Sequence, residues 1–301
     1  MTIAVTSPTN SHDDTAIERY GVQHDPRHPT AFQIFVKPIR KLIYHVLHKN
    51  KHLSPEEEAK APWHMLNLPS YGNWTGDAWH VRLHGNVYRP SAPEGKKLDN
   101  FVNFCLVRAS IKKERFWRKH FTLLNETEAK QARVQAKELA TTPIYNASIA
   151  ASINGLCNES QNRTNTTNVD GDFNTFVHFS QTCAEQAGDS TQQIQFVNIT
   201  VKPGDHVLDA DNQDQYVVRT ALVPPHGLTI VSDNDDVLRV AEVWNWKQAL
   251  LNTFARHYQP IDGMPEILHK WHNSTPGTHF HYISDLPQPL SRFYVTGTDA
   301  Q

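Results

Sequence analysis

The chain has 301 residues, which is long enough for two ordinary domains or for one large domain with extensions. Its 29 basic and 31 acidic side chains give a formal net charge of −2, and this balance argues against binding of nucleic acid through bulk charge. No apolar run approaches the ~18 residues that a membrane span needs. Because the N-terminus lacks the pattern of a signal peptide, we expect a cytoplasmic protein.

The first part of the chain divides into two segments. Residues 1–30 are rich in Ser, Thr, Pro, Asp and His without apolar periodicity, which predicts a disordered tail. Residues 31–60 contain a basic amphipathic helix, Phe32–Lys51, with apolar side chains at helical spacing and basic side chains between them. Such a helix either packs on its own protein or lies on an anionic membrane surface, so peripheral membrane contact is one interpretation.

Residues 79–220 have the features of a β-rich module. Trp79–Tyr88 alternates between apolar and polar residues, and short strands are expected at 173–179 and 194–201. Asp170-Gly171 is a hairpin signal. Since residues 112–139 have helical spacing, we predict a sandwich-like module with a helix inserted in it or beside it.

Residues 222–301 have a different pattern. Leu228-Thr-Ile-Val-Ser is a continuous apolar run typical of a strand buried on both faces, and Phe280-His-Tyr-Ile-Ser is a second. Two helical stretches lie between them, so the order strand, helices, strand predicts a parallel βαβ unit. The expected fold class is therefore α+β with a partial α/β part. We interpret His279 and His281, on one strand face, as packing residues rather than metal ligands.

An acidic run directly follows the first of these strands. Three carboxylates, Asp233, Asp235 and Asp236, stand at the tip of an apolar strand, where their mutual repulsion needs compensation. Clustered oxygen donors suit Mg²⁺, and ligands of α/β sheets bind at the carboxyl ends of strands. A solvated acidic turn is the alternative interpretation. At the corresponding end of the second strand lies Ser284, by itself a weak signal.

Several motifs in this part of the chain occur together and in a recognisable order. They are Pro225-His-Gly-Leu-Thr-Ile-Val-Ser-Asp-Asn-Asp-Asp-Val-Leu-Arg, Val243-Trp-Asn-Trp, Leu251-Asn-Thr-Phe, Asp262-Gly-Met-Pro and Phe280-His-Tyr-Ile-Ser-Asp-Leu-Pro. Together they resemble the catalytic domain of the fungal actin-patch-protein type of phosphatidate phosphatase, in the haloacid-dehalogenase superfamily. The resemblance implies the N-terminal half of a haloacid-dehalogenase-like Rossmannoid sheet, and a phosphatidate or other phospholipid substrate.

The resemblance also implies roles for individual residues. Asp233 matches the nucleophile that forms an aspartyl-phosphate, and Asp235 matches the general acid and base. The Asp233 carboxylate and the Asp235 backbone carbonyl would hold Mg²⁺. Ser284 matches the hydroxyl that binds a phosphoryl oxygen. The implied reaction is hydrolysis of phosphatidate to diacylglycerol and phosphate.

Three positions depart from the family pattern. Val237 replaces a common Thr, and Asp285-Leu286 replaces Asn-Ser. In addition, only seven residues follow Tyr294, whereas the superfamily site takes a lysine and a second acidic cluster from strands further downstream. Two interpretations remain open: a catalytic domain truncated at the C-terminus, or a catalytically inactive member that binds membranes or partners.

Overall fold

The computed structural model describes most of the chain between residues 62 and 283. The described residues are 62–90, 94–108, 124–153, 160–180, 194–203, 216–275 and 277–283. The predicted tail 1–30, the basic helix Phe32–Lys51 and Ser284 lie outside them. Among the helices that the structure describes, none combines the length and the apolar character needed to cross a bilayer.

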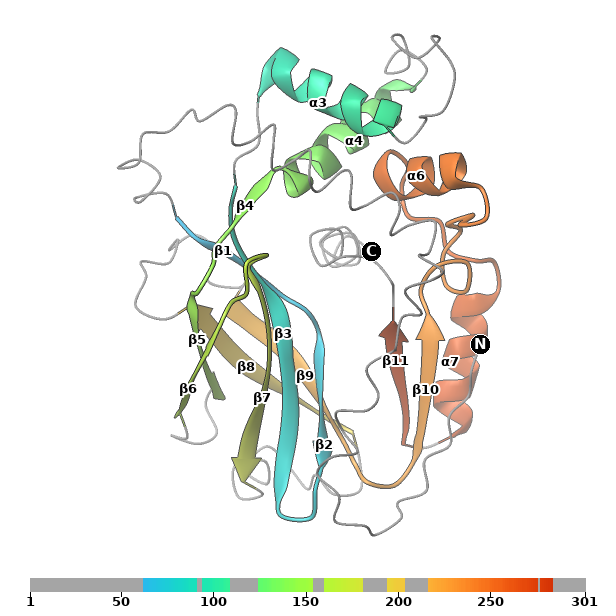
Figure 1. Cartoon of the computed structure of the whole chain (residues 1–301). Coiled ribbons are helices and arrows are strands. Elements are labelled where there is room, and N and C mark those ends of the chain that lie inside the picture. Colours follow the sequence, from blue (N-terminus) through green and yellow to red (C-terminus); the bar gives the residue numbers. More distant parts are fainter. Residues whose placement is uncertain are drawn as a thin grey trace, which may run out of the picture.

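Nine strands form one large sheet on one side of the molecule (Figure 1). They are β1 (His64–Asn67), β2 (Ser70–Trp74), β3 (Ala78–Pro90), β4 (Thr141–Pro143), β5 (Ser148–Ile153), β6 (Ser160–Thr166), β7 (Asp172–Ser180), β8 (Gln195–Pro203) and β9 (Val217–Val223). The order is β1-β3-β2-β9-β8-β5-β6, with β4 and β7 also paired to β3. This sheet therefore begins upstream of Trp79.

The long strand β3 joins the two flanks of this sheet. Along one edge β7 pairs antiparallel with residues 78–86, and β4 continues the edge to Pro90. Along the other edge lie β2 and β1. The sheet curls into a half-barrel (Figure 1). The predicted sandwich is therefore wrong, because these strands share one hydrogen-bonded sheet that folds around its own core rather than two sheets that face each other.

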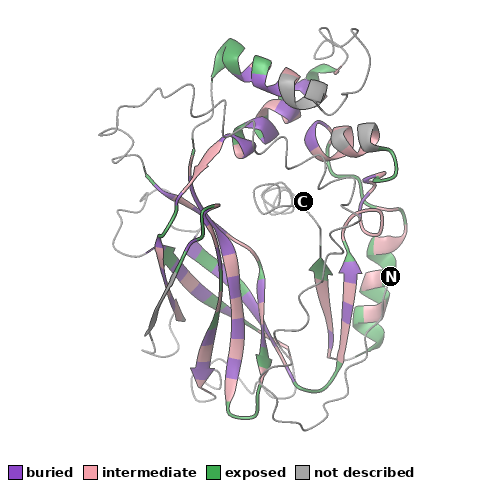
Figure 2. Cartoon of the chain, in the orientation of Figure 1, coloured by how far each residue is buried: buried purple, intermediate pink, exposed green. Residues whose placement is uncertain are grey.

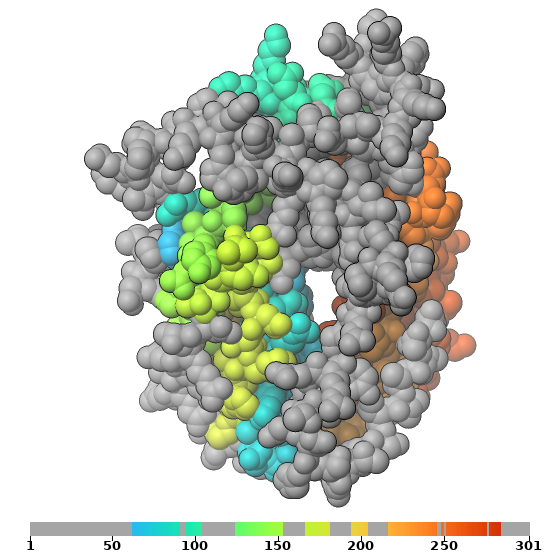
Figure 3. All heavy atoms as spheres, viewed as in Figure 1, coloured from blue at the N-terminus to red at the C-terminus, as the bar shows by residue number. Residues whose placement is uncertain are grey.

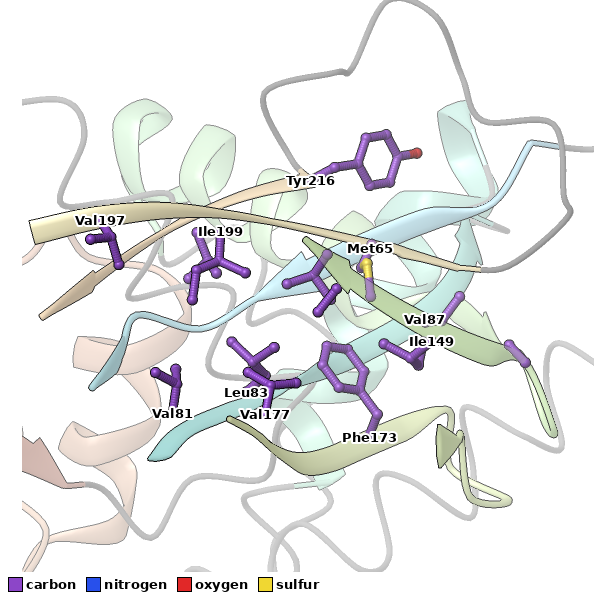
Figure 4. Packing of buried hydrophobic residues seen from close by; sticks show 14 of the residues in the cluster. Met65, Val81, Leu83, Val87, Ile149, Phe173, Val177, Val197, Ile199 and Tyr216 are labelled. Atoms are coloured by element: carbon purple, nitrogen blue, oxygen red, sulfur yellow. The ribbon is translucent and has the colours of Figure 1, made fainter. Parts of the chain in front are cut away.

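The core of the sheet lies inside this curl. Alternate side chains of β3, among them Trp79, Val81 and Leu83, are fully buried, as the period of two along a strand requires. Figure 4 shows Val81 and Leu83 with Val177 and Phe173 of β7 and Ile199 of β8, all directed into the same space. The intervening residues of β3, including Arg82 and His84, are only partly buried and point to the opposite face.

Two helices lie between β3 and β4 in the described part of this connection. They are α3 (Gly95–Arg108), which the sequence did not predict, and α4 (Glu126–Leu139), which confirms the C-terminal half of the predicted helix. Asn125 and Glu128 form a capping box that fixes the start of α4. An ion pair at 2.7 Å joins Arg133 of α4 to Asp99 of α3, so the two helices form one unit.

The predicted turn at Asp170-Gly171 is present, but it does not make a hairpin. Gly171 has a φ of 75°, and a Cβ there would come within 2.4 Å of the Val87 carbonyl oxygen, so glycine is required. The strands on either side bind different neighbours, since β6 pairs with β5 and β7 pairs with β3. The turn therefore carries the chain from one flank of the curled sheet to the other.

The C-terminal part contains the predicted parallel unit. Strand β10 (Leu228–Asp233) pairs in parallel with β11 (Thr278–Ile283), and the helices α6 (Trp246–Phe254) and α7 (Met264–Ser274) connect them. The strands are not buried on both faces: in β10 only Ile230 and Ser232 are buried, and β11 ends in exposed residues. In Figure 2, α7 has no buried residue, whereas the curled sheet alternates regularly.

The parallel strands lie between α7 and the curled sheet. Phe280 approaches His272 of α7 with ring centroids 6.5 Å apart. On the opposite face, His279 and His281 approach Tyr71 of β2, at 6.3 and 4.6 Å. Figure 3 shows the visible cyan to yellow part of the curled sheet at the left and centre and the orange to red part of the chain, which includes α7, at the right. The described residues thus contribute two parallel strands, and the haloacid-dehalogenase topology remains a prediction.

Candidate active site

Asp233 is the last residue of β10, at the carboxyl end of the parallel pair. It lies opposite Ile283 of β11, and the backbone N–H of the next residue, Asn234, donates to the Ile283 carbonyl at 3.0 Å. The Asp233 side chain is exposed, and its Oδ1 accepts the backbone N–H of Asp235 at 3.2 Å. No described side chain forms an ion pair with it. The sequence prediction of a carboxylate presented at a strand tip is consistent with this position.

Asp235 is held by a partner that the sequence analysis missed. Nε of Arg239 donates to Asp235 Oδ1 at 2.7 Å, with 7 % of the Arg239 side chain and 16 % of the Asp235 side chain exposed. The same guanidinium donates through Nη2 to Thr253 of α6 at 3.0 Å. The spacing of four residues between Asp235 and Arg239 was the available signal. Arg239 thus fixes the acidic turn, residues 233–236, against α6.

Asp236 stabilises the loop that follows the strand β10. Its Oδ1 accepts the backbone N–H groups of Ala241 and Glu242 at 2.9 and 2.6 Å, and its Oδ2 accepts that of Val243 at 2.8 Å. Its φ of 58° lies in the left-handed region, which aspartate tolerates better than most residues. Asp236 therefore folds the loop that leads into α6, and both of its oxygens are engaged.

These contacts refine the electrostatic argument made from the sequence. From the sequence, either a cation or other donors were expected to compensate three neighbouring carboxylates, and the structure shows other donors at two of them. A guanidinium compensates Asp235 and backbone N–H groups compensate Asp236, so only Asp233 presents a solvent-facing carboxylate. In the described part of the chain, no three His, Cys, Asp or Glu side chains gather in a metal-binding group.

The donor set still fits a magnesium site of a restricted kind. Mg²⁺ commonly keeps several waters and takes one or two carboxylates together with substrate phosphate. The Asp233 carboxylate and the Asp235 backbone carbonyl are oxygen donors of the hard type that Mg²⁺ prefers. Ser284, the third predicted site residue, lies outside the described residues; Ile283, which precedes it, is the strand partner of Asp233.

A tyrosine borders the acidic turn. The Tyr258 hydroxyl donates to the Leu238 carbonyl at 3.4 Å. Burial raises the pKa of Tyr258 above its ordinary value of 10, with Arg239 opposing this shift and Asp235 adding to it. Tyr258 therefore remains a neutral hydrogen-bond donor at physiological pH, and it supports the turn rather than supplying charge to it.

The histidine pair on β11 lies at the contact with the curled sheet, as the packing interpretation predicted. Burial, with a contribution from His281, lowers the pKa of His279, and burial with Arg82 lowers that of His281. His84 of β3 has its pKa lowered to about 4 by burial, Arg82 and His281. The buried Nδ1 of His84 and Nε2 of His279 form no hydrogen bond in the structure. These imidazoles are neutral packing groups at neutral pH.

The comparison with protein families bears on this same segment. Residues 228–299 match the family model described as "Phosphatidate phosphatase APP1, catalytic domain". No curated protein and no solved structure matches the chain. The matched segment begins with β10 and includes Asp233, the acidic turn, both connecting helices and β11. This match supports the family that the motifs indicated, so residues 228–299 are similar to the catalytic domain of a phosphatidate phosphatase, a hydrolase that acts on a phospholipid.

Proposed function

We propose that the protein is a Mg²⁺-dependent phosphatase that hydrolyses phosphatidate, or a closely related phospholipid, to diacylglycerol and phosphate. One observation carries the proposal. The segment that matches a phosphatidate phosphatase catalytic domain places an exposed carboxylate, Asp233, at the carboxyl end of a parallel strand pair. That end of a parallel sheet is where α/β proteins bind ligands.

In the proposed reaction, Asp233 is the nucleophile. One of its carboxylate oxygens attacks phosphorus, and the bond from phosphorus to the glycerol oxygen breaks to leave an aspartyl-phosphate. A carboxyl proton of Asp235 passes to the departing oxygen. Asp235 then accepts a proton from water, whose oxygen attacks phosphorus, releases phosphate and restores the Asp233 carboxylate. When bound, Mg²⁺ would supply charge neutralisation for the phosphoryl group.

The contact between Asp235 and Arg239 limits how Asp235 can act. Because Arg239 binds Oδ1 at 2.7 Å, the proton in this proposal is carried by Oδ2. Arg239 also binds Thr253, so it keeps the Asp235 carboxyl group from rotating when Oδ2 gains or loses its proton. Arg239 is thus a positioning residue in the proposed reaction, and Ser284 is proposed to bind a phosphoryl oxygen.

The finer family assignment belongs to the same proposal. We propose the actin-patch type of phosphatidate phosphatase as found in fungi, with a haloacid-dehalogenase-like sheet and a cytoplasmic location. The basic helix Phe32–Lys51 would bring the protein to anionic membranes. The support is the motif resemblance together with the family match.

A second candidate is a catalytically inactive, membrane- or partner-binding member of the family. One observation favours it: within the described ranges, the acidic side chains do not form a metal-binding group. In that case Asp235, Asp236 and Arg239 would hold a loop and Asp233 would have no chemical partner. A measurement of whether the chain itself catalyses phosphate release distinguishes the two candidate functions.

The test is phosphate release from phosphatidate in mixed micelles with and without Mg²⁺. We expect Mg²⁺-dependent release that Asp233→Asn lowers by roughly a thousandfold or more, because the nucleophile is lost while an isosteric side chain remains. Asp77→Asn, a change in the exposed turn between β2 and β3, is the matched control and should retain release. Equal release by Asp233→Asn and the parent chain, or none from a folded parent chain, would refute the catalytic proposal.

A further inference from the structure

Two apolar side chains protrude beside the candidate active site. Trp244 is 76 % exposed and its neighbour Val243 is 50 % exposed. Among the large hydrophobic side chains that the structure describes, Trp244 is the most exposed. Isolated exposed apolar residues are ordinary on protein surfaces, but an adjacent pair in the loop that follows the acidic turn requires an explanation.

The loop that carries this pair is fastened to the acidic turn. Asp236 accepts the backbone N–H of Val243 and of the two residues before it. Val243 and Trp244 form the exposed tip of this loop. Below this tip, Ala241 is buried, and its carbonyl accepts a hydrogen bond from Nδ2 of Asn252 on α6 at 3.3 Å. Because the backbone is already held in place, the apolar tip can enter a binding partner with little cost in ordering.

The chemistry of the tip suits a lipid interface. Tryptophan has a large apolar ring and one polar N–H, and it concentrates at the boundary between headgroups and acyl chains. Acidic residues outnumber basic ones in this stretch: between residues 233 and 247 the basic residues are Arg239, which is buried and paired with Asp235, and Lys247. Glu242 and Asp233 add negative charge. The contact should therefore depend on apolar insertion and not on attraction to anionic lipids.

We propose that Val243 and Trp244 insert into the interfacial region of a lipid bilayer and thereby present the Asp233 end of β10 to a headgroup phosphate. This inference rests on the proposed function, because the phospholipid substrate is what places a membrane next to this loop. It differs from membrane contact through Phe32–Lys51, which would be electrostatic. A protein partner that uses Trp244 as an anchor is the competing occupant, and the test separates the two.

The first experiment measures binding of the full chain to phosphatidylcholine vesicles by flotation, at high salt to suppress the electrostatic contribution of the basic helix. Trp244→Ala should lower the bound fraction roughly tenfold, because a fully inserted Trp side chain is lost. Trp244→Phe should bind at an intermediate level. Tyr145→Ala removes a comparably exposed aromatic, 67 % exposed, from the turn before β5 and should bind as the parent chain does.

Two results of the flotation experiment would overturn the inference. One is equal vesicle binding by Trp244→Ala and the parent chain, which is also the result expected for a protein partner. The other is the absence of binding by the parent chain to zwitterionic vesicles. Far-ultraviolet circular dichroism and thermal unfolding of each variant check that the exposed substitution leaves the fold intact.

A second readout distinguishes this inference from the proposed catalysis. For each variant, phosphate release is measured from phosphatidate in vesicles and from a short-chain, monomeric phosphatidate, and the ratio is compared. Trp244→Ala should lower the ratio, whereas Asp233→Asn should abolish release and still float with vesicles. Trp244-dependent flotation without release by the parent chain would refute catalysis and support the lipid contact. An unchanged ratio with normal release would refute the lipid contact alone.

Discussion

The two halves of the described structure are packed to different degrees. The curled sheet of β1–β9 encloses a continuous apolar core in which Trp79 and Leu83 are fully buried. The parallel unit of β10, β11, α6 and α7 buries far less, and α7 has no buried residue at all. Yet the family match and the candidate active site lie in the second region. Stability and the proposed chemistry are therefore concentrated in different parts of the chain.

The parallel unit is held in place by polar and aromatic contacts. Its strands rest against the outer face of the curled sheet through His279, His281 and Tyr71. The bend that follows its helix α6 is joined to α4 by an ion pair between Arg256 and Glu128 at 3.2 Å. Its acidic turn is held internally by polar contacts rather than by a core. Interactions of this kind are local and directional, which suits a site whose side chains must be presented to a ligand.

The largest effect on stability should come from the core of the sheet. Phe173→Ala removes a buried ring that packs on Gly85 of the adjacent strand β3, and we expect a loss of about 3–5 kcal/mol in the free energy of unfolding. Ile267→Ala on the exposed side of α7 should cost less than about 0.5 kcal/mol. Urea unfolding of both variants measures the difference. Similar losses for the two substitutions would contradict the comparison between the regions.

A smaller effect should follow from the buried ion pair of the parallel unit. Arg239→Leu leaves the Asp235 carboxylate without its guanidinium partner, and we expect a loss of about 3 kcal/mol in the free energy of unfolding. The double variant with Arg239→Leu and Asp235→Asn should regain part of the lost free energy of unfolding, because the unpaired charge is then removed. The same urea assay on the single and double variants gives the coupling energy. Purely additive losses would show that the pair does not hold the turn.

The effect that is smallest near neutral pH concerns the contact between the two regions, and it grows as the pH falls. Burial keeps the pKa values of His84, His279 and His281 below the ordinary 6.5, and that of His84 is about 4. The unfolded chain therefore binds more protons than the folded chain when the pH falls below about 6.5. The stability linked to these neutral imidazoles is present above pH 6.5 and is lost as the pH falls toward 4.

The measurement is the free energy of unfolding against pH, with His84→Gln as the comparison. One such histidine contributes a slope of about 1.4 kcal/mol per pH unit in this window, and the variant should lose that part of the slope. The charged or titratable neighbours that act on His84 are Arg82 on β3 and His281 on β11, and His281 also acts on His279. Identical slopes for the two proteins would mean that His84 is not buried at the contact.

The local elements of both regions could be predicted from residue patterns. Alternation identified β3 and β7, and helical spacing identified α6, α7 and most of α4. The continuous apolar runs gave the parallel pairing of β10 with β11, because strands separated by helices return in the same direction. The position of Asp233 at a strand tip and the family resemblance also came from these residues, since strand ends and motifs are local features.

Which strands and side chains become neighbours could not be predicted from residue patterns and depends on the folded chain. Whether the β-rich strands form a sandwich or one curled sheet depends on which edges pair, and alternation is the same in both cases. The partners of the carboxylates were equally hidden. Asp235 and Asp236 look alike in the sequence, but one faces a guanidinium and the other three backbone N–H groups. Charge compensation depends on distances of a few ångströms in the folded chain, and residue order alone does not set those distances.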